Sequence, residues 1–468
     1  MLKLCLAHPV FYPTFGGGSL RFLRYQPGLR KRDVQTRVLA GTGRTKDATH
    51  PGDPQDWSRH PIGRMLPVES IEGIPVHRVR LPDETSVRRT AIYFRALIAL
   101  CRDPATRPDV IQLHSFERLE SLYWIPRLRR LGIPIVYAIQ ISSPLHHRSK
   151  LLGVLQPKML RLFYDQFDGV VTSSEQIQAR LRQLGVARPI AVIPNGVDLE
   201  RHRPADEAAR RAARARIGIQ GNGPVLLSVG AISPRKGSDL LVEAWTRLLP
   251  RHPDLELVLV GPRPDHGSKQ RSAFERRIDA LIEGSGRARQ VHRLGVRDDV
   301  ADLYAAADLM ALPTSREGGT PNVVLEAMAS GRPVLLTPFD GQSTAIGRPG
   351  VEFAQTPRTV LALAQSIDEL LANEARRDAL AKSGLDWVRA HLDLDRSLDR
   401  FADFYERAAH RSLDAAEVAA QNPTFPGARI LSARPALAPD PRLPPDPRLP
   451  PHATLPTADR PRAGSSPE

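Results

Sequence analysis

The part of the chain best suited to chemistry is residues 313–338, PTSREGGTPNVVLEAMASGRPVLLTP. Glu317 precedes a glycine pair, and Glu326 lies about two turns inside the helix predicted behind that pair. A helix N-terminus that follows glycines binds phosphate well, because free backbone amides and the helix dipole converge there. One carboxylate can then face a sugar and the other a ribose, on opposite sides of a diphosphate. This spacing indicates a nucleotide-sugar pocket.

A second candidate group lies in the segment GAISPRKG, residues 230–237, between a predicted strand and a predicted helix. Ligands of open α/β sheets bind at the carboxyl ends of the strands, so Lys236 is expected to reach a phosphate, with Arg235 beside it. A departing diphosphate gathers negative charge, which a fixed cation and backbone donors stabilise. A lysine that is merely solvated is the alternative for a single loop residue.

The first half of the chain offers weaker candidates. Three glycines, residues 16–18, follow the first predicted strand, and Gly17 and Gly18 would let the backbone approach a ligand closely. A plain loop tip is the alternative. The segment is not the dinucleotide-binding fingerprint, because Arg21 stands where the third glycine is required. His114 ends another predicted strand and is a candidate catalytic residue, with a structural histidine as the equal alternative.

The sequence lacks the residues for a metal site, a disulfide framework, a signal peptide and a membrane span. His146 and His147 have no further ligands at a useful spacing, so we expect no protein-held metal and no cofactor besides the substrate. Cys5 and Cys101 cannot form a disulfide framework, which favours a reducing compartment. No signal peptide is evident, and no apolar run approaches the roughly 20 residues that span a bilayer. We therefore expect a cytoplasmic protein.

The formal charge of +15 and the pI of about 10.3 favour anionic partners. No nucleic-acid recognition module accompanies the charge, so nucleic acid is not an expected partner. Residues 146–164 interleave basic and apolar side chains and could lie on an anionic membrane at the inner face of the cell envelope. A helix that packs on its own sheet, with its charges outward, is the more common outcome of such a pattern.

Short apolar runs alternate with helix-length segments along the chain, which predicts two doubly wound parallel sheets in series. We expect a first domain over residues 1–200, a second over 201–385, a closing helix over 386–412, and a Pro-rich tail without a core over 421–468. A helical pattern covers residues 354–409. The predicted strands are Leu2–Ala7, Gln35–Ala40, Ile74–Arg80, Val110–His114, Ile135–Gln140, Val170–Ser173, Ile190–Pro194, Val225–Ala231, Leu255–Gly261, Val291–Gly295, Leu309–Pro313 and Pro333–Thr337.

Together these segments resemble glycosyltransferase family 4, the retaining nucleotide-sugar transferases of the GT-B fold. The resemblance covers roughly residues 1–410, and the stretch from Glu317 to Pro333 is diagnostic. The other matching stretches are Gly16–Gly18, Ile193–Asp198, Ser233–Gly237, Gly295 and Tyr304–Asp308.

The resemblance implies two Rossmann-like domains facing across a cleft, with the sugar nucleotide on the second domain and the acceptor on the first. By analogy Lys236 neutralises the diphosphate, Glu317 contacts the donor sugar, and Glu326 binds the ribose. Family members mostly work without a bound metal and build glycolipids, lipopolysaccharide, capsule or exopolysaccharide at the cytoplasmic membrane face. The donor-binding residues are expected to be Gly17, Gly18, Arg235, Lys236, Glu317, Gly318, Gly319, Thr320, Asn322 and Glu326.

Three departures from the family pattern keep a rival hypothesis open. Eight residues rather than the usual seven separate Glu317 from Glu326. Ala231 stands where an arginine is common, and Gln140 where a histidine is common. The leading hypothesis is a retaining glycosyltransferase that acts on a glycan, glycolipid or polysaccharide precursor. The alternatives are an inactive scaffold in a polysaccharide-assembly complex and a GT-B-like epimerase or phosphorylase.

Overall fold

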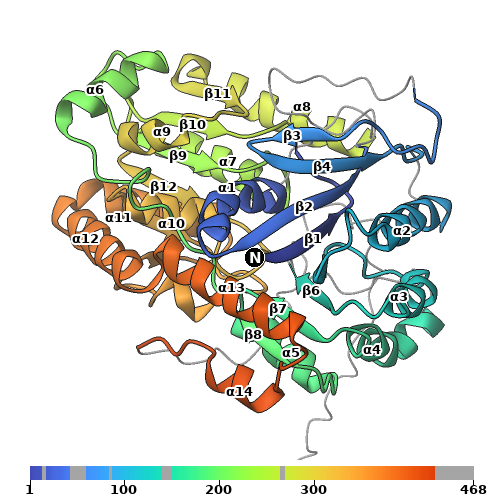
Figure 1. Cartoon of the computed structure of the whole chain (residues 1–468). Helices are drawn as coiled ribbons and strands as arrows, with labels where there is room; N and C mark the ends of the chain where they lie inside the picture. The colour runs from blue at the N-terminus through green and yellow to red at the C-terminus, as the bar shows by residue number, and fades with distance from the viewer. Residues whose placement is uncertain (13–16, 43–59, 84–86, 140–149, 264–268, 427–468) are drawn as a thin grey trace, which may run out of the picture.

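The structure is a computed structural model, and it describes residues 1–12, 17–42, 60–83, 87–139, 150–263 and 269–426. The chain forms two α/β units, each built on its own largely parallel sheet (Figure 1). The predicted fold class, two Rossmann-like domains in series, is confirmed.

The first sheet has the order β3-β4-β2-β1-β5-β6-β7-β8 and is parallel except for the antiparallel pair β3–β4. Its strands are β1 (Leu2–His8), β2 (Val34–Gly41), β3 (Glu69–Ile71), β4 (Ile74–Val79), β5 (Val110–Leu113), β6 (Ile135–Ile139), β7 (Gly169–Thr172) and β8 (Ile190–Val192). The helices of this unit are α1 (Gly17–Lys31), α2 (Val87–Arg102), α3 (Ser121–Arg129), α4 (Lys150–Tyr164) and α5 (Glu175–Gln183).

The second sheet has the order β11-β10-β9-β12-β13-β14, with every pair parallel. Its strands are β9 (Val225–Val229), β10 (Glu256–Val260), β11 (Val291–Gly295), β12 (Leu309–Leu312), β13 (Val334–Leu336) and β14 (Ala354–Gln355). The helices that follow β8 are α6 (Glu207–Arg216), α7 (Ser238–Leu248), α8 (Lys269–Gly284), α9 (Val300–Ala306), α10 (Asn322–Ala329), α11 (Val360–Ala372), α12 (Glu374–His391), α13 (Leu394–Ala409) and α14 (Ala415–Ala420), with 3₁₀ turns η2 (Ala288–Gln290) and η3 (Thr344–Ile346).

Both faces of the first sheet are covered, which explains its continuous apolar strands. In β1, Cys5 and Ala7 point into the core shared with α2, α3, α4 and α5. Leu4 points to the opposite face, where α1 and α13 pack. Because side chains alternate along a strand, one short apolar strand serves two helical layers.

Each sheet has a switch point, where the strand order reverses and ligands of such folds bind. In the first sheet it lies between β1 and β5, and in the second between β9 and β12. The segment after β9 carries Lys236, and the segment after β12 carries Glu317. The topology therefore brings together two segments that are far apart in the sequence.

The closing part of the chain differs from the sequence prediction in two respects. Ala354 begins strand β14 rather than a helix, and it pairs with Leu335 of β13. The expected crossing helix over 386–412 is divided, because α12 ends at His391 and the Asp393 side chain caps α13 by accepting from Asp395 N. The helix α12 packs in the second unit, whereas α13 packs on α1 and β1 of the first.

The Pro-rich tail was predicted to begin at residue 421, which is too early. Residues 421–426 pack on the folded part, with the Asn422 side chain accepting from Val192 N (2.7 Å) at the edge strand β8, and with Phe425 beside Trp387. An edge strand leaves backbone groups unpaired, and Asn422 satisfies some of them. Residues 427–468 lie outside the described part of the chain.

Candidate active site

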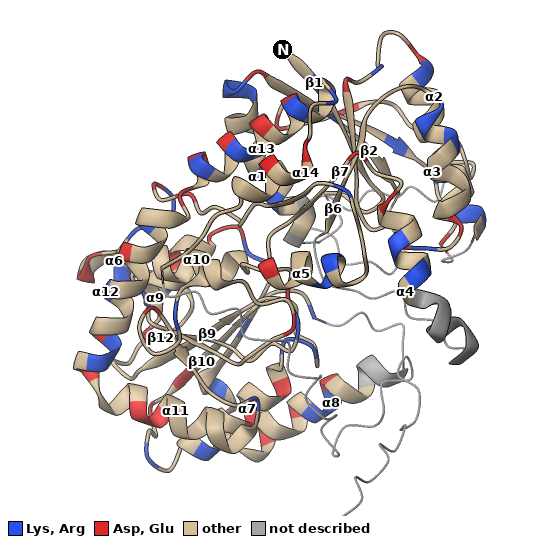
Figure 2. Cartoon of the chain, turned by 90° about the horizontal axis from the view of Figure 1, so that it is seen from below, with Lys and Arg blue, Asp and Glu red and all other residues tan. Residues whose placement is uncertain are grey.

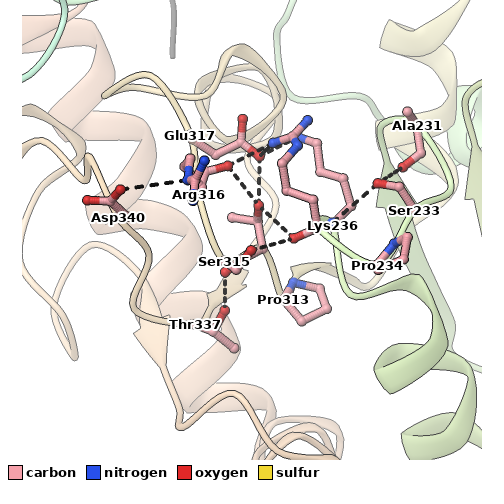
Figure 3. A network of polar contacts seen from close by, with 12 residues as sticks. Ala231, Ser233, Pro234, Lys236, Pro313, Ser315, Arg316, Glu317, Thr337 and Asp340 are labelled. Carbon is pink, nitrogen blue, oxygen red and sulfur yellow. Dashed lines mark hydrogen bonds and ion pairs between the residues drawn. The ribbon is translucent and has the colours of Figure 1, made fainter. Parts of the chain in front are cut away.

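Glu317 is held by three donors that converge on a single oxygen. Its Oε1 accepts from Lys236 Nζ at 2.7 Å, from an Arg235 guanidinium nitrogen at 2.8 Å and from Thr314 Oγ1 at 2.7 Å. Among the described residues, the polar contacts of the carboxylate are all made by Oε1, and Figure 3 shows the second oxygen turned away from the cluster. The second oxygen is therefore placed to accept from a ligand.

Burial and charge together set the protonation of this cluster. Burial lowers the pKa of Lys236, and the positive charge of Arg235 lowers it further. The Glu317 carboxylate raises it in part, but the net pKa lies below that of an ordinary lysine. Burial alone would raise the pKa of Glu317, but Lys236, Arg235 and Thr314 outweigh it and hold the pKa below its usual value. Glu317 is therefore an anion at neutral pH.

Glycines allow the lysine segment to approach the end of β12. Gly230 has φ +142°, and a Cβ there would lie 3.1 Å from Lys236 Cε, so the lysine side chain lies across a bare backbone. Gly237 has φ +70°, and a Cβ there would meet Pro313 O at 2.3 Å. The segment is also fixed from the other side, because Ser315 N donates to Arg235 O at 2.9 Å. These contacts hold the cationic side chains against Glu317.

The glycine turn after Glu317 packs against the first unit. Gly319 has φ +110°, and a Cβ there would lie 2.1 Å from Ser173 O. Ser173 Oγ donates to Gly318 O, and Thr320 Oγ1 accepts from Asn195 N at 2.8 Å. The residue that lengthens the spacing between the two glutamates is thus accommodated in a turn pressed on Ser173, and Glu317 still reaches Lys236.

Helix α10 begins behind this turn without a side-chain cap. Its N-cap residue, Pro321, has no side-chain oxygen to offer, and Asn322 Oδ1 is buried without a hydrogen-bond partner. The amides of Val324 and Leu325 donate to Pro321 O, so those of Asn322 and Val323, the first two of the helix, remain available to an anion. Helix α10 begins at Asn322, so Glu326 lies just over one turn inside it rather than the predicted two turns.

Glu326 is held by one partner from each unit. Its Oε1 accepts from Arg24 of α1 at 2.8 Å, and its Oε2 accepts from Tyr304 Oη of α9 at 3.0 Å. The Arg24 side chain is 36% exposed, against 8% for that of Glu326. The carboxylate expected to bind a ribose is therefore occupied by an arginine from the facing unit.

His114 lies in the first unit, at the switch point between β1 and β5, and is fully buried. Its Nε2 is 2.6 Å from the Gln112 amide nitrogen, and its ring centroid is 5.2 Å from that of His8. Burial, His8 and Arg21 hold the pKa of His114 well below the ordinary value, so the ring is neutral at pH 7. The described contacts do not join it to Lys236 or Glu317.

The remaining predicted residues fall near α1 or outside the described residues. Gly17 and Gly18 form the first turn of α1 rather than a loop. The carbonyl oxygen of Ala231 accepts a hydrogen bond from Ser233 Oγ. Arg235 points into the site and donates to Glu317. Gly16, Gln140, His146 and His147 lie outside the described part of the chain. In the described residues, no group of three His, Cys, Asp or Glu side chains gathers closely enough to hold a metal ion.

Sequence reasoning missed four residues of the site. Thr314 donates to Glu317, and Tyr304 donates to Glu326. The Asn195 amide donates to Thr320, and Arg24 forms an ion pair with Glu326. Tyr304 and Asn195 belong to stretches already identified as similar to the family. For Arg24, which is 302 positions from its partner, the sequence carries no local signal.

Comparison with known proteins identifies the family of both units. Residues 16–196 match the family described as glycosyl transferase 4-like domain, and residues 223–373 match glycosyl transferases group 1. A D-inositol 3-phosphate glycosyltransferase of Segniliparus rotundus is 30% identical over 71% of this chain and 71% of its own length. A GDP-mannose-dependent alpha-(1-6)-phosphatidylinositol monomannoside mannosyltransferase of Mycobacterium tuberculosis is 30% identical over 60% of this chain and 71% of its own.

Solved structures share the fold. Sucrose-phosphate synthase of Thermosynechococcus elongatus superposes with a TM-score of 0.67 at 20% identity, covering 87% of this chain and 99% of that one. Anabaena HepE, solved in complex with UDP-glucose, superposes with a TM-score of 0.65 at 19% identity, covering 87% of this chain and 100% of that one. With the family matches in both units and the cation–carboxylate cluster between β9 and β12, the chain belongs to the group 1 glycosyltransferases of the GT-B fold, the family 4 type.

Proposed function

We propose that this enzyme transfers a sugar from a nucleotide-diphosphate sugar to an acceptor hydroxyl, with retention of the anomeric configuration. The observation that carries the proposal is the cluster of Lys236, Arg235 and Glu317 at the switch point of the second sheet. Two buried or half-buried cations beside one carboxylate match a ligand with a diphosphate at one end and sugar hydroxyls at the other. The relatives whose names state a donor or acceptor use GDP-mannose or inositol phosphates, and we leave the base open.

The donor would lie along the turn between the two glutamates. Lys236 and Arg235 face the diphosphate, together with the free amides at the start of α10. The unpaired oxygen of Glu317 accepts from a sugar hydroxyl. Glu326 accepts from the ribose hydroxyls once Arg24 moves aside. In this proposal the charge on the leaving group is met by side chains, without a protein-held metal or cofactor.

The reaction proceeds on the face of the sugar that carries the leaving group. The bond from the anomeric carbon to the phosphate oxygen breaks, and the acceptor oxygen forms its bond to that carbon from the same side. The acceptor proton passes to the departing phosphate oxygen, and both electrons of the broken bond remain on the diphosphate. Lys236 stabilises the charge that develops there, and orientation in the cleft supplies much of the remaining acceleration.

The acceptor would bind to the first unit, near His114 and the start of α1, and would be a glycan or a lipid-linked precursor of the cell envelope. None of the described helices is long and apolar enough to cross a membrane. We place the enzyme on the cytoplasmic side, in peripheral contact with an anionic membrane and with no nucleic acid partner.

The test is a transfer assay with a panel of sugar nucleotides and lipid-linked acceptors, in which NMR reads the anomeric configuration of the product. A product with the anomeric configuration of the donor is expected. An inverted product would refute the front-face step. Donor binding without turnover on any acceptor would favour the scaffold hypothesis, and a changed sugar nucleotide without acceptor would favour an epimerase.

A further inference from the structure

Three helices on one face of the first sheet carry basic residues but no aspartate or glutamate. These are α2, α3 and α4, which lie side by side (Figure 2). On the opposite face the pairing differs, because Arg32, directly after α1, pairs there with Asp395 and Asp399 of α13. On the face of α2, α3 and α4 the pairing is only partial, because Arg129 and Arg161 pair with Asp168 and Asp165, which follow α4.

Arginines gather most closely between α2 and α3. A cavity of about 460 Å³ is lined by Arg95 and Arg102 of α2, by Arg127 of α3, and by Arg130 directly after it, over an apolar floor that includes Ile98 and Leu131. Arg95, Arg102 and Arg130 are exposed, and none of them forms an ion pair within the described part of the chain. Such a cluster of like charges, without an acidic partner among the described residues, fits an anionic group from outside.

Helices α3 and α4 also expose apolar and aromatic side chains. Tyr123 of α3 is 55% exposed, and the Arg127 guanidinium lies over its ring, 3.2 Å from the centroid. Leu162 of α4 is 59% exposed, although its neighbours Leu160 and Phe163 are buried in the core. Exposed Tyr and Leu beside arginines are typical of protein surfaces that sit at a bilayer interface, where rings and chains enter the headgroup region.

We infer that the outer face of α2, α3 and α4 is a docking surface for an anionic lipid bilayer, with the arginine cavity holding lipid phosphates. This inference rests on the proposed function in one respect, because it specifies the membrane contact assigned there. Its location on the first unit would place a lipid-linked acceptor near the domain expected to bind it. A duplex nucleic acid would match the charge but not the exposed Tyr123 and Leu162.

The test is flotation of the full chain with vesicles of phosphatidylcholine, with and without phosphatidylglycerol. We expect binding only to the anionic vesicles, and weaker binding at high salt. The triple variant Arg95→Gln/Arg102→Gln/Arg130→Gln should reduce partitioning by about fivefold per arginine, roughly 100-fold in total. Tyr123→Ala should reduce it a few-fold without changing its salt dependence.

The matched control removes the same charge from exposed positions of the second unit, Arg276→Gln/Arg289→Gln/Arg389→Gln. Thermal melting confirms that each variant is folded. Equal loss in both triple variants would overturn the inference, since net charge alone would then explain binding. Binding of a DNA duplex but not of vesicles, lost in the first variant, would also overturn it. Because the readout requires no donor, failure here leaves the transfer reaction untouched.

Discussion

The two glutamates of the site are held in different ways. Glu317 has all its partners in the second unit, where Lys236, Arg235 and Thr314 converge on one oxygen. Glu326 has one partner from that unit, Tyr304, and one from the other, Arg24. The Glu317 cluster is therefore organised before any ligand arrives, whereas the state of Glu326 depends on how closely the two units approach.

Other polar contacts also join the two units. Glu175 accepts from Ser343 Oγ at 2.8 Å, and Arg180 pairs with Asp340 at 2.9 Å. These pairs join α5 of the first unit to loops of the second. Interfaces of this polar kind are typical of domains that move relative to one another. The contacts of Glu326 thus change if the two units separate, whereas that of Glu317 with Lys236 does not.

Replacement of Lys236 tests the Glu317 cluster, which is organised before a ligand binds, and should have the largest effect. Lys236→Ala removes the cation that meets the leaving diphosphate, so kcat should fall by about 10²–10³. Steady-state kinetics with saturating donor measures this, and Lys236→Arg, which keeps the charge, is the matched control. A kcat within a few-fold of wild type, in a protein that melts normally, would contradict the assigned role.

The next largest effect is expected from Glu317→Gln. The amide keeps the shape of the side chain but leaves Lys236 and Arg235 without a counter-charge. Loss of a charged hydrogen bond costs about 1.5–3 kcal/mol, so kcat/KM should fall roughly 10- to 100-fold. Glu175→Gln serves as a control. Because Glu175 contacts Ser343 between the two units, this substitution should change KM more than kcat. If Glu317→Gln also changed only KM, the carboxylate would be a binding group and nothing more.

The pH dependence should separate free from donor-bound enzyme. Burial lowers the pKa of Lys236 from the ordinary lysine value of 10.5, so the free enzyme loses this charge as pH rises through the lowered pKa. Beyond that point kcat/KM should fall about tenfold per pH unit. A bound diphosphate raises the pKa again, so the alkaline limb of kcat should lie at higher pH. In Lys236→Arg both limbs should disappear, because guanidinium keeps its proton. Coincident limbs at an ordinary lysine pKa would argue against a buried, catalytically required lysine.

The smallest effect is expected at Arg24. Arg24→Ala vacates Glu326 Oε1, and a half-exposed ion pair contributes about 0.2–1 kcal/mol, so the donor KM should fall by a few-fold at most. Arg32→Ala is the control, because Arg32 directly follows the helix that carries Arg24 but pairs with α13. A rise in donor KM for Arg24→Ala alone would mean that Arg24 contacts the donor rather than competing with it.

The sequence predicted the Glu317 cluster better than the surroundings of Glu326, for a physical reason. Lys236 and Glu317 each follow the carboxyl end of an apolar strand, and adjacent parallel strands end at the same edge of a sheet. Strand recognition alone therefore brings together segments about 80 positions apart, as the 82-position separation of Arg235 and Glu317 shows. The contact of Arg24 with Glu326 depends on the relative placement of two units, which no local pattern encodes.

Short and irregular elements also could not be predicted from the hydrophobic pattern of the sequence. Strand β14 has only two residues, and an apolar alternation of that length cannot be told from the start of a helix. Residues 421–426 look like the beginning of a Pro-rich tail, yet the Asn422 side chain satisfies the edge of β8. His114 was placed correctly at the end of a strand, but its complete burial follows from packing against Phe22 and His8, which come from other elements.

The most direct test of the donor site is calorimetric titration of the purified protein with UDP-, GDP-, ADP- and dTDP-sugars, with Glu326→Ala as the comparison. We predict that donors with one base bind, that the affinity falls by roughly 10- to 100-fold in Glu326→Ala, and that thermal melting shows both proteins folded. Binding of no donor by the folded wild type, or equal binding by the variant, would contradict the assignment of the two glutamates to a nucleotide-sugar pocket.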